Sequence, residues 1–333
     1  MTAERRGRVL EAMAERDVDA LILGKEANAR YVSGARRLWL AGARAFAPGC
    51  VLVGETGEVH LLSITDDGVP PEVPVANLYP ITWNPVNLFG RLAAIEGLAS
   101  ARRIGVDDLT PLMEMLLTST FPKTELTDGR QLMLTARAHK LPAEVERIRA
   151  ATVLAARALD DVVDAVRPGA RECDLKALFE QRMCELRTTT PAFEGTFGHR
   201  FPSARALEAG ELVVLDVGVL VDGYEGGLAR TVVCGQGRSA SMANPADGLF
   251  DALLAGARPD ATAGDLWAAW DATGHARPTE PVVVGVGLGV EPPIFGDEGA
   301  LAAGTTISLR AEAGGWVRRE TVLVTESGAE VLG

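Results

Sequence analysis

Apolar and polar residues alternate along the first 136 residues with spacings that predict helices and strands in turn. Residues 5–16 predict an amphipathic helix, because their apolar residues fall on one side: Val9, Leu10, Met13 and Ala14. The next run, VDALILG, predicts a buried strand, and CVLVGETGEVHLLSI predicts a hairpin that turns at GETG. Further helices are expected around residues 88–96 and 111–118. This part of the chain therefore predicts a compact α/β domain, residues 1–136.

A longer periodic stretch follows and predicts one long helix. It begins at Pro142, which suits a first helical turn, and Glu144 adds favourable charge there. Its apolar positions recur at helical spacing until Pro168-Gly169 ends it: Val145, Ile148, Ala155, Leu159, Val162 and Val166. Strands are predicted at residues 212–220, 228–234, 282–288, 306–309 and 321–325. The pattern predicts a second α/β domain, residues 137–333.

The second domain contains an internal repeat. RPGARECDLKALF, from Arg167, matches RPDATAGDLWAAW, from Arg258, at an offset of 91 residues. Downstream, LEAGELVVLD and LAAGTTISLR match in shape at an offset of 94. Two collinear matches at nearly one offset predict a duplicated unit with pseudo-twofold symmetry. The alternative is chance similarity between two alanine-rich helices, which a second match at nearly the same offset makes weaker. The second match places Arg310 opposite Asp216 across the pseudo-twofold axis.

Composition and charge exclude several classes of partner. The net charge of −12 opposes binding to nucleic acid or to an anionic membrane surface, which both favour a basic face. The longest apolar run, VVVGVGLGV, is far shorter than the ~20 residues of a membrane span. The N-terminus has no apolar core of a signal peptide, and the four cysteines form no CxxC pair. We therefore expect a cytoplasmic protein with reduced thiols.

Several segments, in order, resemble the family of creatinase, Xaa-Pro aminopeptidases and prolidases. They are DALILGKEANARYVSGAR, LTARAHKLPAEVERIRAA, LEAGELVVLDVGVLVDGYEGGLARTV, VGVGLGVEPPIF and VRRETVLVTESGAEVL. The resemblance covers nearly the whole chain. It implies a creatinase-like N-terminal α/β domain followed by a catalytic domain of the pita-bread fold, and a homodimer.

The resemblance also implies where metal ligands would stand. Peptidases of the family hold two divalent metals with two Asp, one His and two Glu. Carried over by position, the first ligand is Asp216, and the others fall on Gly227, Val284, Arg310 and then either Arg319 or, if the alignment slips by one residue, Glu320. Glycine and valine side chains offer no lone pair, and protonated arginine repels a cation. We therefore predict no catalytic metal and no other cofactor.

Three residues are predicted to be catalytic. His199 lies 17 residues before Asp216, the spacing of the family's substrate-facing histidine, which is the acid/base in metal-free creatinase. A loop histidine that bonds the backbone is the alternative. Asp216 needs a new cationic partner, and Arg310 is expected to form a two-pronged pair with it. That pair either serves catalysis or only fills an inactive site.

Five further residues are predicted to bind substrate. Arg319 is expected to hold a substrate carboxylate, and Arg230 and Tyr224 match pocket-lining positions of the family. Tyr224 alternatively packs beside the strand turn. Glu225 faces either way, and the sequence leaves open which of Arg319 and Glu320 faces the pocket.

These observations together predict a metal-independent, creatinase-like enzyme. Its substrate is expected to be a small anionic, amino-acid-derived molecule, because arginines here replace the acidic groups with which creatinase holds a cationic substrate. We expect C–N hydrolysis or a proton-transfer step such as elimination, cyclisation or isomerisation, of a kind that suits an enzyme of specialised biosynthesis. A non-catalytic binding module and a metal-dependent peptidase are the alternatives.

Overall fold

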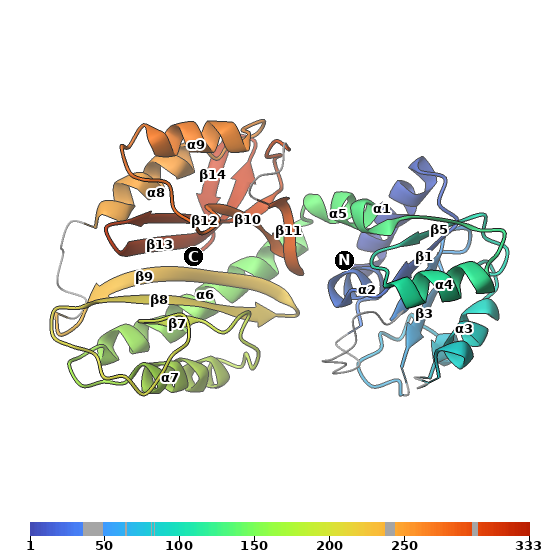
Figure 1. Ribbon diagram of the computed structural model, residues 1–333, viewed down its shortest axis with the longest axis horizontal. Coiled ribbons are helices and arrows are strands. Elements are labelled where there is room, and N and C mark those ends of the chain that lie inside the picture. The colour runs from blue at the N-terminus through green and yellow to red at the C-terminus, as the bar shows by residue number, and fades with distance from the viewer. Residues whose placement is uncertain (36–48, 64, 81, 83, 237–243, 295–298) are drawn as a thin grey trace. The chain divides into compact units, whose positions relative to one another are not determined.

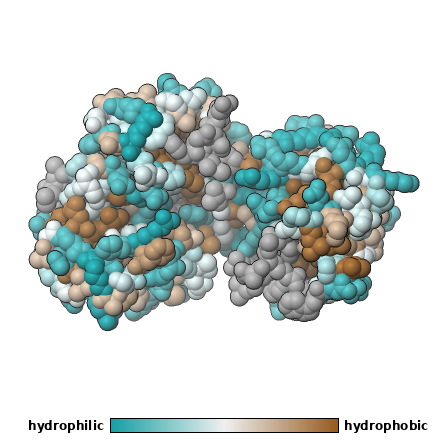
Figure 2. Space-filling model, viewed as in Figure 1, coloured by the Kyte–Doolittle hydropathy of each residue, from teal (hydrophilic) through white to brown (hydrophobic). Residues whose placement is uncertain are grey.

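The computed structural model describes residues 1–35, 49–63, 65–80, 82, 84–236, 244–294 and 299–333. The chain divides into two compact units, Met1–Arg137 and Ala138–Gly333 (Figure 1). Among the described residues, the first unit has a six-stranded sheet and the second an eight-stranded sheet. The face drawn in Figure 2 has apolar residues interspersed with hydrophilic ones on both units. In the part of the chain that is described, no helix is long and apolar enough to cross a membrane.

The sheet of the first unit is mixed, with the strand predicted from VDALILG inside it. Its order is β4-β3-β2-β1-β5-β6. β1 pairs antiparallel with β2 and parallel with β5, and β2 and β3 form the predicted hairpin. All four residues of β1 are buried. The strands are β1 (Ala20–Leu23), β2 (Cys50–Val53), β3 (Val59–Leu62), β4 (Leu78–Tyr79), β5 (Arg103–Val106) and β6 (Glu125–Asp128).

Helices of the first unit begin where the sequence supplies caps. The Asn84 side chain accepts from Val86 N and the Thr110 side chain from Met113 N, and a proline follows each cap. The helices are α1 (Thr2–Glu15), α2 (Glu26–Ser33), α3 (Pro85–Ala93), α4 (Pro111–Thr120), α5 (Gly129–Ala138) and the short 3-10 helix η1 (Val75–Asn77). The pattern predicted α1, α3 and α4, whereas α2 and α5 were not predicted.

Two hairpins form the centre of the second sheet, whose order is β11-β10-β12-β13-β9-β8-β7, with β14 paired to β13. They turn at Asp222-Gly223, with φ of 49° and 84°, and at Gly314-Gly315, with φ of 59° and 82°. Two-residue turns with positive φ match the twist of the flanking strands. The strands are β7 (Thr196–Phe197), β8 (Leu212–Val221), β9 (Tyr224–Val233), β10 (Val283–Gly287), β11 (Gly289–Ile294), β12 (Thr306–Ala313), β13 (Trp316–Thr325) and β14 (Gly328–Val331).

The helices of the second unit cover one face of this sheet. They are α6 (Pro142–Ala165), α7 (Glu172–Glu185), α8 (Pro245–Gly256) and α9 (Ala263–Asp271). Leu215 and Val217 of β8 pack with α6 and α7, and Leu309 and Ala311 of β12 pack with α8 and α9. Both pairs thus cover the same face, and yet in Figure 1 the pair α6 and α7 lies on the opposite side of the strands from the pair α8 and α9. The sheet therefore curves, and its helix-free face is the concave one.

The internal repeat is confirmed by equivalent backbone contacts in the two halves. Gly169 N donates to Leu207 O, and Asp260 N donates to Leu301 O at 2.9 and 2.8 Å. These two contacts are related by the offsets of 91 and 94 residues that the sequence predicted. Each joins the segment before a helix, α7 or α9, to the segment before a central strand, β8 or β12.

Helix α6 approaches β9 so closely that one residue must be glycine. A Cβ atom on Gly226 would lie 2.3 Å from Thr152 N and 2.6 Å from Ile148 O, both backbone atoms of α6. Real Cβ atoms do not approach backbone this closely, so a side chain at Gly226 would push the helix off the sheet.

We expect Gly226→Ala to lower the free energy of unfolding by about 3 kcal/mol, because overpacking against backbone cannot relax by a rotamer change. The matched control is Gly248→Ala in α8, where an added Cβ meets nothing within 4 Å. That change should be neutral or stabilise by up to about 1 kcal/mol. Urea unfolding followed by circular dichroism measures both, and equal stability of Gly226→Ala and the unsubstituted protein would contradict the close packing.

Candidate active site on the concave face

A row of residues crosses four strands on the concave face. Asp216 of β8 stands opposite Ala229 of β9, Ala229 opposite Arg319 of β13, and Arg319 opposite Arg310 of β12. Residues directly opposite one another project to the same side of a sheet. The neighbours of Asp216 in β8, Leu215 and Val217, pack in the helix-covered core. Asp216, Arg310 and Arg319 therefore share the helix-free face.

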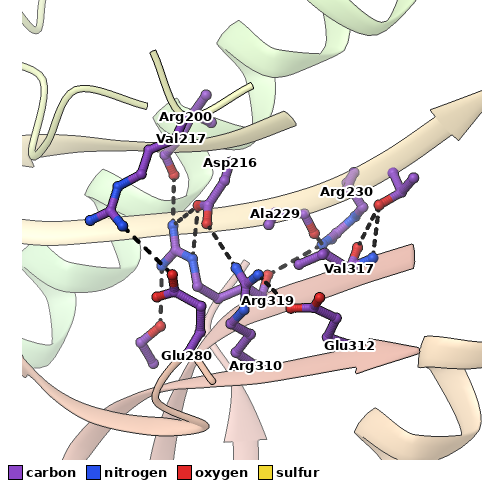
Figure 3. Close-up of polar contacts among 12 residues, drawn as sticks. Arg200, Asp216, Val217, Ala229, Arg230, Glu280, Arg310, Glu312, Val317 and Arg319 are labelled. Atoms are coloured by element: carbon purple, nitrogen blue, oxygen red, sulfur yellow. Dashed lines mark hydrogen bonds and ion pairs between the residues drawn. The ribbon is translucent and has the colours of Figure 1, made fainter. Parts of the chain in front are cut away.

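Arg319 is the main partner of Asp216 (Figure 3). Arg319 Nε and Nη2 donate to Asp216 Oδ1 at 2.9 and 2.6 Å. Arg310 Nη1 lies 3.5 Å from Asp216 Oδ2, and Arg310 Nη2 donates to Glu312 Oε2 at 2.9 Å. The expectation that Arg310 forms the two-pronged pair was wrong, since Arg319 supplies both short contacts and Arg310 is shared between two carboxylates.

The protein uses most of the donors of Arg319. Besides its contacts to Asp216, Arg319 Nη2 donates to Val217 O at 3.0 Å and Nη1 donates to Ser308 Oγ at 3.1 Å. Its guanidinium carbon lies 5.2 Å from the centre of the Phe193 ring, a cation–π distance. The side chain is only 9% exposed. Arg319 is thus a buried cation whose charge Asp216 balances.

Gly227 leaves the space that this guanidinium fills. A Cβ atom there would lie 3.0 Å from Arg319 Nη2 and 2.5 Å from Val217 O. Val284 of β10 stands opposite Ser308 of β12, at the side of the same face. Among the described residues, no group of three or more His, Cys, Asp or Glu side chains is arranged to hold a metal ion.

Glu320, Arg230 and Tyr224 project to the opposite side, because side chains alternate along β13 and β9. Arg230 Nη2 and Glu320 Oε1 form an ion pair of 2.8 Å, and Arg318 Nε lies 3.3 Å from the same oxygen. The Tyr224 hydroxyl is buried and donates to Glu144 Oε1 at 2.7 Å. Of the two candidates that the sequence left open, Arg319 shares the helix-free face with Asp216 and Glu320 does not.

Glu225 lies on the concave side, four residues from Ala229 in β9. Burial raises the pKa of its carboxyl above the ordinary value, and the positive charge of Arg319 opposes part of that rise. The negative charges of Asp216 and Glu291 add to the rise. Glu225 is therefore within electrostatic reach of the ion pair.

His199 has a different carboxylate partner. Its Nδ1 lies 2.5 Å from Glu172 Oε1, where Glu172 is the first residue of α7. Glu172 Oε2 also accepts from Ser203 N and Ser203 Oγ, both at 3.0 Å, and Oε1 accepts from Arg205 Nε at 3.0 Å. Burial raises the pKa of Glu172, but these hydrogen bonds outweigh it and lower the pKa to about 2. Glu172 is a buried anion that no sequence motif had indicated.

Arg200 and Glu280 form an ion pair that was not predicted. Arg200 follows His199 and lies 3.6 Å from Glu280, with side chains 77% and 50% exposed. Figure 3 draws this pair in the same view as Arg319. The basic residue next to His199 in FGHRF was the available signal for Arg200. Nothing local marks Glu280, because the sheet brings it there from the segment before β10.

Comparison with known proteins places this geometry in a family. Residues 146–326 match the model of the metallopeptidase family M24, and residues 5–139 match that of the creatinase/prolidase N-terminal domain. An Xaa-Pro dipeptidase of Pyrococcus horikoshii is 25% identical over 243 residues, which cover 68% of this chain and 63% of the relative. A creatinase of a Bacillus species is 25% identical over 247 residues, which cover 68% and 59%. The chain thus matches less than two thirds of the length of these relatives.

Solved structures agree over nearly the whole chain. The prolidase from Pyrococcus horikoshii has a TM-score of 0.81 at 22% identity, covering 99% of this chain and 97% of the prolidase. The X-Pro aminopeptidase from Thermotoga maritima has a TM-score of 0.78 at 17% identity, covering 98% and 96%. The predicted fold, a creatinase-like domain followed by a pita-bread domain, is confirmed.

We expect Arg319→Met to lower the free energy of unfolding at pH 7 by about 3 kcal/mol, because it leaves Asp216 buried without its cation. The double variant Asp216→Asn/Arg319→Met should recover part of that loss. Arg310→Met, which removes only the longer contact, should cost about 1 kcal/mol. Urea unfolding measures all three, and a double variant no more stable than Arg319→Met would argue against the ion pair.

We expect Glu172→Gln to lower stability at pH 7 by about 2 kcal/mol. A carboxyl whose pKa is lowered on folding stabilises the protein above its unfolded pKa, and this contribution is lost as pH falls through the folded value. The difference should therefore shrink between about pH 4.5 and the folded pKa of about 2. Urea unfolding across this range, with exposed Glu208→Gln as control, tests it; a pH-independent difference would contradict the lowered pKa.

Proposed function

Because the chain belongs to the metallopeptidase family M24 and carries the creatinase/prolidase N-terminal domain, we propose that it is a metal-independent, creatinase-like enzyme. Its substrate is a small, carboxylate-bearing, amino-acid-derived molecule. The reaction is C–N hydrolysis or a proton-transfer step such as elimination, cyclisation or isomerisation. The comparisons support membership of a family of hydrolytic enzymes, and to this we add metal independence and the substrate class.

One observation carries the proposal: the guanidinium of Arg319 lies beside Gly227 and donates twice to Asp216. The family name implies a metal, and divalent cations need several oxygen or imidazole ligands that converge on one point. Here Asp216 faces two guanidinium groups instead. These residues do not fit a divalent cation, because a cationic side chain already supplies the positive charge that Asp216 requires.

His199 is the proposed acid/base. Its ring is 65% exposed and held at Nδ1, so Nε2 is the nitrogen left to exchange a proton with substrate. Arg310 is the proposed anchor for the substrate carboxylate. Arg310 makes weaker hydrogen bonds to Asp216 than Arg319 does, because 3.5 Å is long for such a bond. Its Nε also has no acceptor among the described residues.

A specific observation favours a second candidate, a non-catalytic binding module. Arg319 directs four hydrogen bonds at protein atoms, and Glu312 and Asp216 together balance Arg310. A face so fully neutralised by its own side chains is also what an inactive, purely structural site needs. In that case the ion pair would stabilise the fold, and ligands would bind elsewhere.

We expect the purified protein to contain well under one equivalent of Mn, Co, Zn or Fe by elemental analysis. It should convert a member of a panel of N-acyl amino acids, ureido acids, guanidino acids and dipeptides, followed by proton NMR, at a rate that EDTA leaves unchanged. His199→Ala and Arg310→Ala should lower kcat/KM about 100-fold or more while leaving the circular dichroism spectrum intact.

The matched control is Arg149→Ala, since Arg149 pairs with Glu330 at the surface, 2.8 Å away. It should retain full turnover. Stoichiometric metal, or activity abolished by EDTA, would contradict metal independence and favour a metal-dependent peptidase. Ligand binding without conversion, unaffected by His199→Ala, would favour the binding module.

A further inference from the structure

The carboxylate of Glu172 is surrounded by donors in a way that a simple loop tether does not require. Ser203 donates twice to Oε2, and Arg205 Nε and Nη2 lie 3.0 and 2.9 Å from Oε1. Arg205 is itself held by two contacts to Glu211, of 3.0 and 2.5 Å. These bonds already fix the loop. The contact of Glu172 Oε1 with His199 Nδ1, at 2.5 Å, is additional.

We propose that Glu172 is a positioning residue for His199. Its carboxylate holds the proton of the neutral imidazole on Nδ1, so that Nε2 carries the lone pair and faces outward. A carboxylate only accepts hydrogen bonds, whereas a neutral imidazole has one N–H donor and one acceptor nitrogen. The contact to Glu172 therefore selects the Nδ1–H form, as a buried acid does for the histidine of hydrolase triads. This inference rests on the proposed function, in which His199 Nε2 exchanges the proton.

The burial of the two groups suits these roles. The side chain of Glu172 is 1% exposed, while that of His199 is 65% exposed. The acid is thus fixed inside the fold, and most of the imidazole that it contacts is exposed to solvent. The hydrogen bonds that lower the pKa of Glu172 to about 2 keep it ionised at neutral pH, so it remains a pure acceptor.

The backbone of the loop is shaped to allow this contact. Gly198, directly before His199, has a φ of +92°, and a Cβ atom on it would lie 2.9 Å from Glu172 Oε1. Only glycine adopts this conformation readily and leaves the carboxylate room. The residue before the histidine is therefore adapted to the acid that orients the ring.

The tautomer of His199 tests the proposal without any substrate. In protein with 15N-labelled histidine at pH 9, where imidazole is neutral, long-range 1H–15N correlation spectra distinguish Nδ1–H from Nε2–H. His199→Asn identifies the signals among those of the four histidines. We expect the Nδ1–H form in the unsubstituted protein and in Glu211→Gln, and a shift toward Nε2–H in Glu172→Gln. Predominant Nε2–H in the unsubstituted protein would overturn the proposal, even if Glu172→Gln did not fold.

Kinetics separates positioning from a structural role. With a substrate found in the panel above, Glu172→Gln should lower kcat about 100-fold or more with KM changed less than about threefold. Glu211→Gln, in the same cluster but not in contact with His199, should leave kcat within about twofold of the unsubstituted protein.

The outcomes distinguish this inference from the function on which it rests. Full kcat in Glu172→Gln, with His199→Ala inactive, would refute positioning and leave the function intact. No turnover of any panel member by the unsubstituted protein would refute the proposed function, and the catalytic meaning of the tautomer with it.

Discussion

The ion pair between Asp216 and Arg319 is the interaction on which the concave face depends. A carboxylate only 14% exposed is costly without a partner, and the partner must reach it from β13 across the intervening strand β9. A long guanidinium side chain can do so only if the residues beneath it are small. Ala229 lies between the two in the row, and Gly227 lies directly beside the guanidinium. The small residues and the arginine are therefore one arrangement.

A second ionic centre, formed by Glu172 and His199, lies at the start of α7 and differs from the first in how far its groups are exposed. The charges of Asp216 and Arg319 are directed at each other, so little of either is exposed. Glu172 is buried more deeply, but one of its donors is the imidazole of His199, most of which remains exposed. In the first centre both charged groups are buried and neutralise each other. In the second, the buried carboxylate contacts an imidazole that is exposed to solvent. A dissolved molecule can therefore reach His199 more easily than it can reach Asp216 or Arg319.

The sequence predicted most of the fold because its signals are local or repeated: the periodic helices, the hairpin of the first unit and the offsets of 91 and 94 residues. The sequence also contained enough information to decide which of Arg319 and Glu320 stands opposite Arg310. A Gly314-Gly315 turn of two residues makes Ala313 and Trp316 neighbours, and counting outward places Arg310 opposite Arg319. The same count from Asp222-Gly223 starts β9 at Tyr224, four residues earlier than the apolar pattern suggested.

The rest of the site depends on contacts between distant segments, which local pattern does not encode. Glu172 and His199 are 27 residues apart, and only the docking of α7 against the loop after β7 joins them. The preference for Arg310 over Arg319 as the closer partner failed for a similar reason. The pseudo-twofold axis gave the correct row, but the reach and packing of each arginine within that row follow from Phe193, Ser308 and Gly227.

The two-residue turns have a consequence for how such a protein changes over evolution. They fix which backbone positions stand opposite one another, and they do so with residues that lie outside the site. A substitution on the concave face that fits the space around it therefore alters the chemistry of that face without changing the strand register, whereas a side chain at Gly227 would displace its neighbours. If the proposed function holds, arginine side chains can take the place of metal ions in this scaffold through a few point mutations, with no insertion or deletion.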